Sequence, residues 1–421
     1  MKPPFLATLI VARLPFYYGW VILGCVCLAG FARQGPAVAV LSIFVAPMTA
    51  EFGWSRTEIS GAVSLGGVLA ALISPIIGPV LDRQGARMVL CLAVLGTGLA
   101  TMALSLVQSL PVYYLLYCFA RMTWAGPYDL GLYSALNAWF VTRRVIANAI
   151  ASMAQISGLV VLPVVAQLAM GYGSWRDGWV AVGAVVLIVG LLPVWLLLAR
   201  RPEDVGLAVD RVKGTEAAPE PRFSRSEAMR TPAFWLLSLY TVLVFPVQAG
   251  VSLHQAPHLI ERGLTPITAA TVIGVFSAMS AVASFSFGFL PRRWPVRYGL
   301  LVSAVLLGVG SFALIWIGVA GDAYIAAGLF GLGIGGVLTL LPVAWADYFG
   351  RESYGAIRGV ALSLQVLAQA AGPLLSGVLR DHSGTYTHSL LVFGVLASLA
   401  AIAALAARQP KALLQKIPTS R

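Results

Sequence analysis

The chain has 421 residues, of which 59% are hydrophobic and only 10% charged, and it carries a formal net charge of +12. This composition lies outside the range of soluble globular domains, so the sequence predicts a membrane protein. It also argues against a nucleic-acid-binding surface, because the basic residues gather in the loops between apolar runs, where they report membrane topology.

Apolar runs long enough to cross a bilayer as helices occur twelve times along the chain. The first and fourth are longer than one crossing requires, which indicates tilt or extension into water. No cleavable signal peptide is expected, because the first run is too long for an h-region and lacks an A-x-A-like site. We therefore predict an all-α membrane protein with twelve transmembrane helices in two six-helix halves. The spans lie near residues 17–46, 57–81, 88–107, 112–140, 145–171, 178–199, 232–260, 267–290, 297–319, 323–349, 355–379 and 387–407.

Basic residues are distributed unequally between the two sets of loops. Alternate loops, beginning with the N-terminus, hold most of the 28 Lys and Arg residues, and this count includes Arg358. The positive-inside rule then predicts that both termini and residues 200–231 are cytoplasmic. The compact loops suit a multi-pass protein of a bacterial inner (plasma) membrane, and the Arg-rich loops are expected to contact membrane lipids. The opposite loops hold Arg56, Arg176, Arg262 and Arg380.

The chain divides into two similar parts. Prolines and charges interrupt the apolar rhythm at 200–231, which predicts an N-terminal half at 1–199, a cytoplasmic linker at 200–231 and a C-terminal half at 232–421. A shift of 211 residues aligns the fifth span with the eleventh without gaps and places Ser152 on Ser363. Such repetition indicates a secondary transporter whose substrate site lies near the midplane between the halves. Repetition alone also fits a channel or a membrane scaffold.

A charged motif lies between the second and third spans. It reads Gly78-Pro-Val-Leu-Asp82-Arg83-Gln-Gly85-Ala-Arg87 and resembles the corresponding loop of the major facilitator superfamily. Its charges are expected to pair with helix ends or with the opposite half in one conformation and to be released in another. Topological anchoring alone would explain the arginines but not the carboxylate or the glycine spacing.

The second half keeps only a remnant of this motif, with Arg where the Asp would be. The gate is therefore expected to be asymmetric. The remnant consists of Gly288 followed by Arg292, Arg293 and Arg297.

Aromatic motifs at four span ends narrow the resemblance. They read Phe16-Tyr-Tyr-Gly-Trp20-Val, Phe52-Gly-Trp-Ser-Arg56, Trp139-Phe-Val-Thr-Arg-Arg144 and Tyr348-Phe-Gly-Arg351. Together they are similar to the monocarboxylate transporter and oxalate:formate antiporter branch in its bacterial form. This resemblance implies a proton-linked or exchange transporter of small organic anions. Such proteins often carry a basic residue in the eighth span, but Ala269 to Phe289 contains none and the eleventh span contains no lysine. The N-terminal half is then expected to supply the positive charge.

Two arginines and one acid lie deep within apolar runs of that half. Charged groups at this depth are costly and mark functional sites by default. Arg33 and Arg121 indicate an anionic substrate, and Arg33 directly precedes a Gly35-Pro36 helix break that suits a cavity lining. Arg121 is either a substrate residue or a brace of the N-terminal half, and Tyr128 and Trp124 are expected on its face.

Asp129 is predicted to be a coupling residue whose partner is Arg33 across a helix contact, or a proton. Burial would favour its neutral form and a neighbouring arginine its ionised form. A fixed counter-ion and a merely buried group stay open as alternatives.

Polar residues of the second half complete the predicted site. His254 and His258 share one helix face near the external mouth, where they either take part in proton or substrate binding or fill an interface. Gln365 and Gln369, with the serines of the eighth span, are predicted to contact the uncharged end of the substrate, and His254 is a further predicted substrate-binding residue. The two histidines lack a third ligand and the four cysteines lack metal-site spacing, so no metal or cofactor is expected.

The function predicted is secondary active transport of small organic anions, most of all monocarboxylates, by alternating access with proton coupling. The expected partners are the anion, protons and lipids, and the protein is expected to be a monomer. A drug or cation exporter, an anion exchanger without proton coupling, and a non-transporting sensor or scaffold remain as alternatives. No phosphate loop, nucleophile elbow or metal-spaced set is present, so neither an enzyme nor an ATP-driven pump is expected.

Overall fold

The computed structural model describes residues 5–11, 13–210, 221–289 and 294–410, and all regular structure in these residues is helical. The first half contains α1 (Phe5–Val11), α2 (Gly19–Arg33), α3 (Val38–Phe52), α4 (Arg56–Gln84), α5 (Ala86–Ala103), η1 (Leu104–Leu106), α6 (Leu110–Thr123), η2 (Trp124–Tyr128), α7 (Asp129–Trp139), α8 (Arg144–Tyr172), α9 (Trp175–Val185), η3 (Val186–Leu191) and α10 (Leu192–Leu197). Two short helices follow, η4 (Pro202–Val205) and α11 (Arg225–Met229). The second half contains α12 (Pro232–Glu261), α13 (Pro266–Gly288), α14 (Val296–Ala313), η5 (Leu314–Trp316), α15 (Ala320–Phe349), α16 (Tyr354–Ser383) and α17 (Thr387–Ala406).

Eleven helical stretches among the described residues are long and apolar enough to cross a membrane. They correspond to eleven of the twelve predicted spans. The remaining span, predicted at 112–140, consists of three consecutive shorter segments, α6, η2 and α7. The π-helical segment η2 contains Gly126 and Pro127, and a proline inside a helix removes a hydrogen-bond donor and disturbs the regular turn. The predicted all-helical membrane fold of twelve crossings is confirmed.

The first crossing is broken as well. α2 ends at Arg33, and α3 begins at Val38, so Gly35 and Pro36 lie in the interruption. The hydroxyl of Tyr117 donates a hydrogen bond of 3.0 Å to the carbonyl of Pro36, because backbone groups freed inside a bilayer need a partner from the protein. The predicted Gly-Pro break is confirmed, and it lies directly beside the deepest arginine of this helix.

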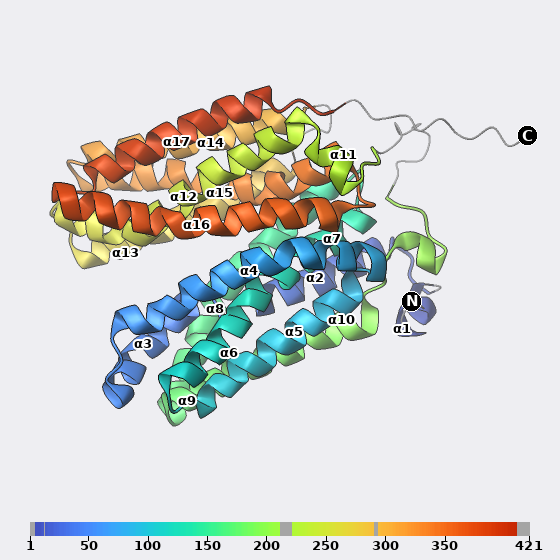
Figure 1. Ribbon diagram of the computed structural model, residues 1–421, viewed down its shortest axis with the longest axis horizontal. Helices are drawn as coiled ribbons and strands as arrows, with labels where there is room; N and C mark the ends of the chain where they lie inside the picture. Colours follow the sequence, from blue (N-terminus) through green and yellow to red (C-terminus); the bar gives the residue numbers. More distant parts are fainter. Residues whose placement is uncertain (1–4, 12, 211–220, 290–293, 411–421) are drawn as a thin grey trace, which may run out of the picture.

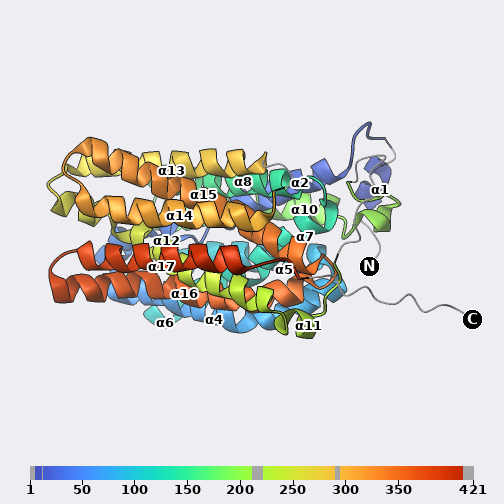
Figure 2. The ribbon, with the colours of Figure 1, turned by 90° about the horizontal axis from the view of Figure 1, so that it is seen from above.

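The molecule has two distinct ends. Figure 1 shows α1, α11 and the last turn of α17 at one side, which we call the terminal face, and the opposite side is the far face. Figure 2 shows the long helices of both halves running between these two faces. In Figure 1 the halves lie together at the terminal face and diverge toward the far face.

Small residues allow the two halves to meet backbone to backbone near the terminal face. α4 packs along α16, and α8 packs along α13. A Cβ atom added to Gly78 would lie 2.2 Å from the carbonyl oxygen of Gly355, and one added to Gly359 would lie 2.6 Å from the carbonyl oxygen of Ser74. Only glycine permits so close an approach. The crossing of α4 and α16 is therefore sealed on this side without room for a side chain.

Candidate functional site

Arg33 and Asp129 form a buried ion pair between α2 and α7. Their Nη2 and Oδ1 atoms are 3.0 Å apart, and the residues are 7% and 6% exposed. The Nη1 of Arg33 donates to the side-chain oxygen of Gln155 at 2.8 Å, and its Nε donates to the carbonyl of Trp124 at 3.0 Å. Gln155 in turn donates to the hydroxyl of Tyr133 at 3.2 Å. The predicted contact of Asp129 with Arg33 is confirmed, and every nitrogen of that guanidinium is engaged.

Arg121 has a different environment. Its guanidinium carbon lies 3.8 Å from the centre of the Trp124 ring, which Arg33 also approaches, at 4.5 Å. The Nε and Nη1 atoms of Arg121 are buried and have no hydrogen-bond partner among the described residues. Its Cβ packs against Gly66 of α4, where an added Cβ would lie 2.6 Å away. An unmet buried donor costs free energy, and more so when it is charged. Arg121 forms no ion pair with a carboxylate among the residues that the structure describes.

Tyr128 does not share the environment of Arg121. Its hydroxyl donates to the carbonyl of Ala29 in α2 at 2.9 Å and lies beside Gly190, whereas Arg121 contacts α4 and Trp124. The expected common face assumed a regular α-helix, but the π-helical segment η2 intervenes and contains an additional residue per turn. The prediction was therefore wrong for Tyr128 and correct for Trp124.

The second half does contain a deep cation. Arg358 lies in α16, is 2% exposed, and its Nη2 is 3.7 Å from Oδ2 of Asp129. The prediction that this half lacks such a charge was wrong, because Arg358 was counted with the loop before the eleventh span. Arg358 lies near the start of α16, close to the membrane edge, so its place in the sequence did not indicate that its side chain is buried. The long side chain extends from there into the protein.

Positive charge exceeds negative charge in this network. The guanidiniums of Arg33 and Arg358 flank the carboxylate of Asp129, and that of Arg121 shares the Trp124 ring with Arg33. Because Arg33 binds that carboxylate most closely, two cations remain incompletely balanced among the described residues, one from each half. A site of this kind favours an anionic ligand, which would satisfy the open donors.

The other predicted site residues lie in the second half. Gln365 accepts a hydrogen bond of 2.7 Å from Arg358, and Gln369 donates to Gln248 at 3.3 Å. His254 lies toward the far face, where its ring centre is 5.3 Å from that of Tyr386 and its Nδ1 has no described partner. The structure thus connects Gln365 to the charged network and places His254 in a separate small cavity with His258.

The charged loop motif joins the halves at the terminal face. The carboxylate of Asp82 accepts hydrogen bonds of 2.8 and 2.7 Å from the amides of Gly355 and Ala356, at the N-terminus of α16. Carboxylates are stabilised at this end of a helix by its dipole and its free N–H groups. Arg87 donates to the carbonyl of Trp195 within its own half at 2.8 Å. The expected paired arrangement is thus present for Asp82.

Two further residues of the motif have simpler surroundings. Gly85 has a φ of 89°, a conformation that suits glycine, and the side chain of Arg200 packs against it. Arg83 is exposed on the terminal face. In the second half, Gly288 packs against Ala149 of α8, while Arg292 and Arg293 lie outside the described residues. In the described part of this remnant, Gly288 therefore packs against the opposite half at α8, as Gly78 packs against α16.

The linker supplies the carboxylate that the second half lacks. Asp210 accepts hydrogen bonds from the amides of Val141, Thr142 and Arg143, which directly precede α8. α8 and α16 are the helices that the 211-residue shift superimposes, so each has a carboxylate at its N-terminal approach, Asp82 from the loop motif and Asp210 from the linker. At this second position Asp210 holds the amides before α8, in place of an aspartate from the loop after α13. This role of the linker could not be inferred from the motif alone.

Other linker residues attach to both halves. Glu203 binds Arg351 at 2.6 Å, and Arg351 also donates to the carbonyl of Ala138 at 3.0 Å. Burial raises the pKa of Glu203, but the hydrogen bond and charge of Arg351 outweigh it, so the pKa of this carboxyl lies below its ordinary value. Phe223 packs edge-on against Phe349. The linker is therefore part of the closed terminal face.

Twelve crossings in two halves, with breaks and buried charges at mid-depth, define a multi-pass membrane protein of the carrier type. Residues 22–373 match the family model described as Major Facilitator Superfamily. Because this match covers most of the chain, the protein belongs to the Major Facilitator Superfamily, a family of membrane transporters.

Individual relatives agree with this assignment. Monocarboxylate transporter 11 of Mus musculus is 27% identical over 392 residues, which cover 89% of this chain and 84% of the relative. The membrane sensor protein UhpC of Escherichia coli K12 is 26% identical over 350 residues, covering 77% and 78%. Among solved structures, the Escherichia coli fucose:proton symporter FucP has a TM-score of 0.73 at 14% identity, covering 94% of this chain and all of that chain. The human organic anion transporter MFSD10 has a TM-score of 0.68 at 16% identity, covering 91% and 97%. These structural likenesses establish the fold.

The two arginines of the first half are expected to differ in their effect on stability. Arg33→Gln leaves Asp129 buried with one weak partner, which should cost about 3–5 kcal/mol of unfolding free energy, whereas Arg121→Gln removes an uncompensated charge and should leave stability unchanged or raise it. Thermal unfolding in detergent measures both effects. The double variant Arg33→Gln/Asp129→Asn should recover much of the loss, and equal destabilisation by the two single variants would contradict this assignment.

The amides before α8 are expected to lose protection when Asp210 is neutralised. Asp210→Ala removes their shared acceptor, so hydrogen exchange at Val141, Thr142 and Arg143 should accelerate about tenfold to hundredfold, in line with the loss of about 1.5–3 kcal/mol for charge-assisted hydrogen bonds. Hydrogen-exchange mass spectrometry of this segment provides the measurement. Asp204→Ala, an exposed carboxylate of the same linker, is the control. Unchanged exchange in the Asp210 variant would contradict a capping role.

Proposed function

We propose that this chain is a secondary active transporter of small organic anions, monocarboxylates above all, that works by alternating access and couples transport to protons. The observation that carries the proposal is the unsatisfied guanidinium of Arg121 stacked on Trp124. A carboxylate that binds there would accept hydrogen bonds from the open donors on one edge of this guanidinium, and the Trp124 ring offers an apolar surface to the rest of a small organic acid. Arg121 therefore takes the leading substrate role, while Arg33 holds Asp129 and orients the site.

Similarity to named transporters supports the substrate class. Relatives over most of the chain are named monocarboxylate transporters, and the buried charge surplus of this chain has the sign that a carboxylate requires. The two arguments are independent, since one depends on sequence similarity and the other on contacts within the structure.

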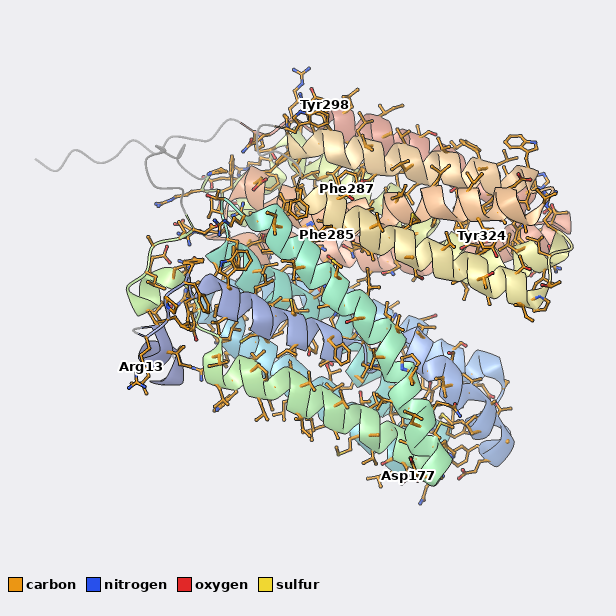
Figure 3. All side chains as sticks on the ribbon, turned by 180° about the vertical axis from the view of Figure 1, so that it is seen from behind. Arg13, Asp177, Phe285, Phe287, Tyr298 and Tyr324 are labelled. Atoms are coloured by element: carbon orange, nitrogen blue, oxygen red, sulfur yellow. The ribbon has the colours of Figure 1, made fainter. Side chains whose placement is uncertain are left out.

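The arrangement of the halves supports a state that is closed at the terminal face. The terminal face is sealed by the glycine contacts of α4 with α16 and by Asp82, while the halves diverge toward the far face (Figure 1). Basic side chains gather at the terminal face, which we assign to the cytoplasm of an inner (plasma) membrane by the positive-inside rule. Figure 3 shows Arg13 at this end and Asp177 and Tyr324 toward the other. Substrate would then enter from the far face.

Asp129 is the proposed coupling residue. Its carboxylate touches Arg33 of the first half and lies near Arg358 of the second. Protonation would remove the charge that holds both arginines, so the attraction across the halves would weaken and the terminal face would open. Proton binding and conformational change would thus act on the same group.

A drug or cation exporter is the second candidate, and the UhpC likeness raises a sensor as a third. A cation exporter requires an available carboxylate at mid-depth, whereas Asp129 is already paired with an arginine. A sensor would bind an anion without moving it. Both alternatives predict outcomes that differ from uptake of organic acids.

Transport of organic acids by the reconstituted protein is the direct test. Proteoliposomes are expected to take up at least one of labelled lactate, pyruvate, formate, oxalate and benzoate. Arg121→Gln should raise KM about tenfold to hundredfold, since it removes charged hydrogen bonds to the substrate, and Arg121→Lys should be affected less. Arg230→Gln, which removes an exposed charge, is the control. Uptake of a lipophilic cation in place of every acid would identify an exporter, and binding without uptake a sensor.

Proton coupling is tested separately with Asp129→Asn. This variant cannot exchange a proton at the site, so an inward proton gradient should no longer drive accumulation, while exchange of internal for external acid should persist. The ratio of accumulated to exchanged label measures the difference. Asp204→Asn serves as the matched control. Undiminished gradient-driven accumulation in the Asp129 variant would leave the protein as an anion exchanger or would place coupling elsewhere.

A further inference from the structure

Arg358 has more hydrogen-bonding capacity than the closed structure uses. The residue is 2% exposed, and its Nη2 donates to Gln365 at 2.7 Å. Its Nε and Nη1 atoms are buried and have no hydrogen-bond partner among the described residues. The nearest carboxylate oxygen is Oδ2 of Asp129 at 3.7 Å, which is beyond hydrogen-bond distance. That oxygen is likewise without a hydrogen bond.

A purely structural ion pair would have a different geometry. An arginine whose role is to hold the two halves together through an ion pair forms short, often bidentate hydrogen bonds with its carboxylate. Asp129 instead gives its closer contact, of 3.0 Å, to Arg33. Arg358 is therefore held near a carboxylate that it shares, and its remaining donors are unmet.

The backbones of Arg121 and Arg358 lie against different levels of α4. Arg121 packs against Gly66 of α4, whereas Gly359, next to Arg358, packs against Ser74. Eight residues separate these two positions on α4, which corresponds to about 12 Å along the helix axis. The backbone of Arg358 is thus closer to the terminal face than that of Arg121, and it belongs to the opposite half.

We infer that Arg358 is a second anchor for the substrate carboxylate, used from the cytoplasmic side. This inference rests on the proposed function. In the state closed at the terminal face, Asp129 neutralises Arg358 in part and the α4–α16 contact covers it. When the halves part at the terminal face, α16 moves away from α7 and Asp129 stays with Arg33. The guanidinium of Arg358 then faces the cytoplasmic pathway with free donors.

The same residues account for the negative charge expected of the ligand. Each half supplies one buried guanidinium with open donors, which suits an anionic group. An anion would bind Arg121 from outside and Arg358 from inside, so each half contributes the anchor for one face. Asp129 prevents Arg358 from retaining the anion once the halves close again, because it competes for the same guanidinium.

Sidedness of the substrate affinity tests this assignment. Right-side-out and inside-out membrane vesicles expose the outer and cytoplasmic faces, and uptake of each labelled acid of the panel gives KM at either face. Arg358→Gln is expected to raise KM about tenfold to hundredfold at the cytoplasmic face and to change it less than about threefold at the outer face. Arg121→Gln should show the larger effect at the outer face. Arg230→Gln, exposed at the terminal face, controls for loss of one positive charge.

Two outcomes would overturn the inference. One is an Arg358→Gln protein with wild-type KM at both faces, and the other is an equal rise at both faces with a lower unfolding temperature, which marks a brace. If the glutamine variant does not fold, Arg358→Lys decides, because it keeps the charge and should raise KM moderately at the cytoplasmic face alone. An effect of the lysine variant on neither face or on both equally would overturn the assignment. Failure of the wild type to carry any acid would instead refute the proposed function.

Discussion

The ion pair between Arg33 and Asp129 determines what the other charges of the membrane domain can do. It crosses from α2 to α7 within the first half and uses the only carboxylate found in this network among the described residues. Because a buried carboxylate binds one close partner far better than several distant ones, the remaining arginines are left available. The pair also depends on both helix breaks, since Arg33 ends α2 directly before Gly35-Pro36 and Asp129 begins α7 directly after η2.

The fold followed from hydrophobicity because a bilayer imposes few choices on the backbone. A run of about twenty apolar residues must form a helix, and the excess of arginine in alternate loops fixes how the helices are threaded. The Gly35-Pro36 break was predictable for the same reason, since proline removes a donor wherever it occurs. The equivalent signal at Gly126-Pro127 indicates the η2 segment. The prediction for Tyr128 assumed a regular α-helix there and therefore placed this residue on the wrong face.

The site was predictable only in part, because burial of a side chain depends on tertiary packing. The depth of Arg33, Arg121 and Asp129 could be counted from span ends, and the pairing of two of them followed from charge. Arg358 lies a few residues inside α16, where counting cannot distinguish a loop arginine from one whose side chain is covered by the opposite half. Asp210 and Gln155 have no motif, so only the folded structure connects them to the gate and to Arg33.

Because Asp210 binds the residues that precede α8, the linker is expected to contribute to the free-energy differences between conformational states. A segment that only connects two halves would tolerate changes of length and composition, because its free energy would be the same in every state. This segment binds the closed terminal face through Asp210, Glu203 and Phe223, and opening that face would have to break some of these contacts. Residues remote from the substrate would then contribute to the free-energy barrier between states. Changes in the linker sequence would therefore alter the turnover rate more than the substrate affinity.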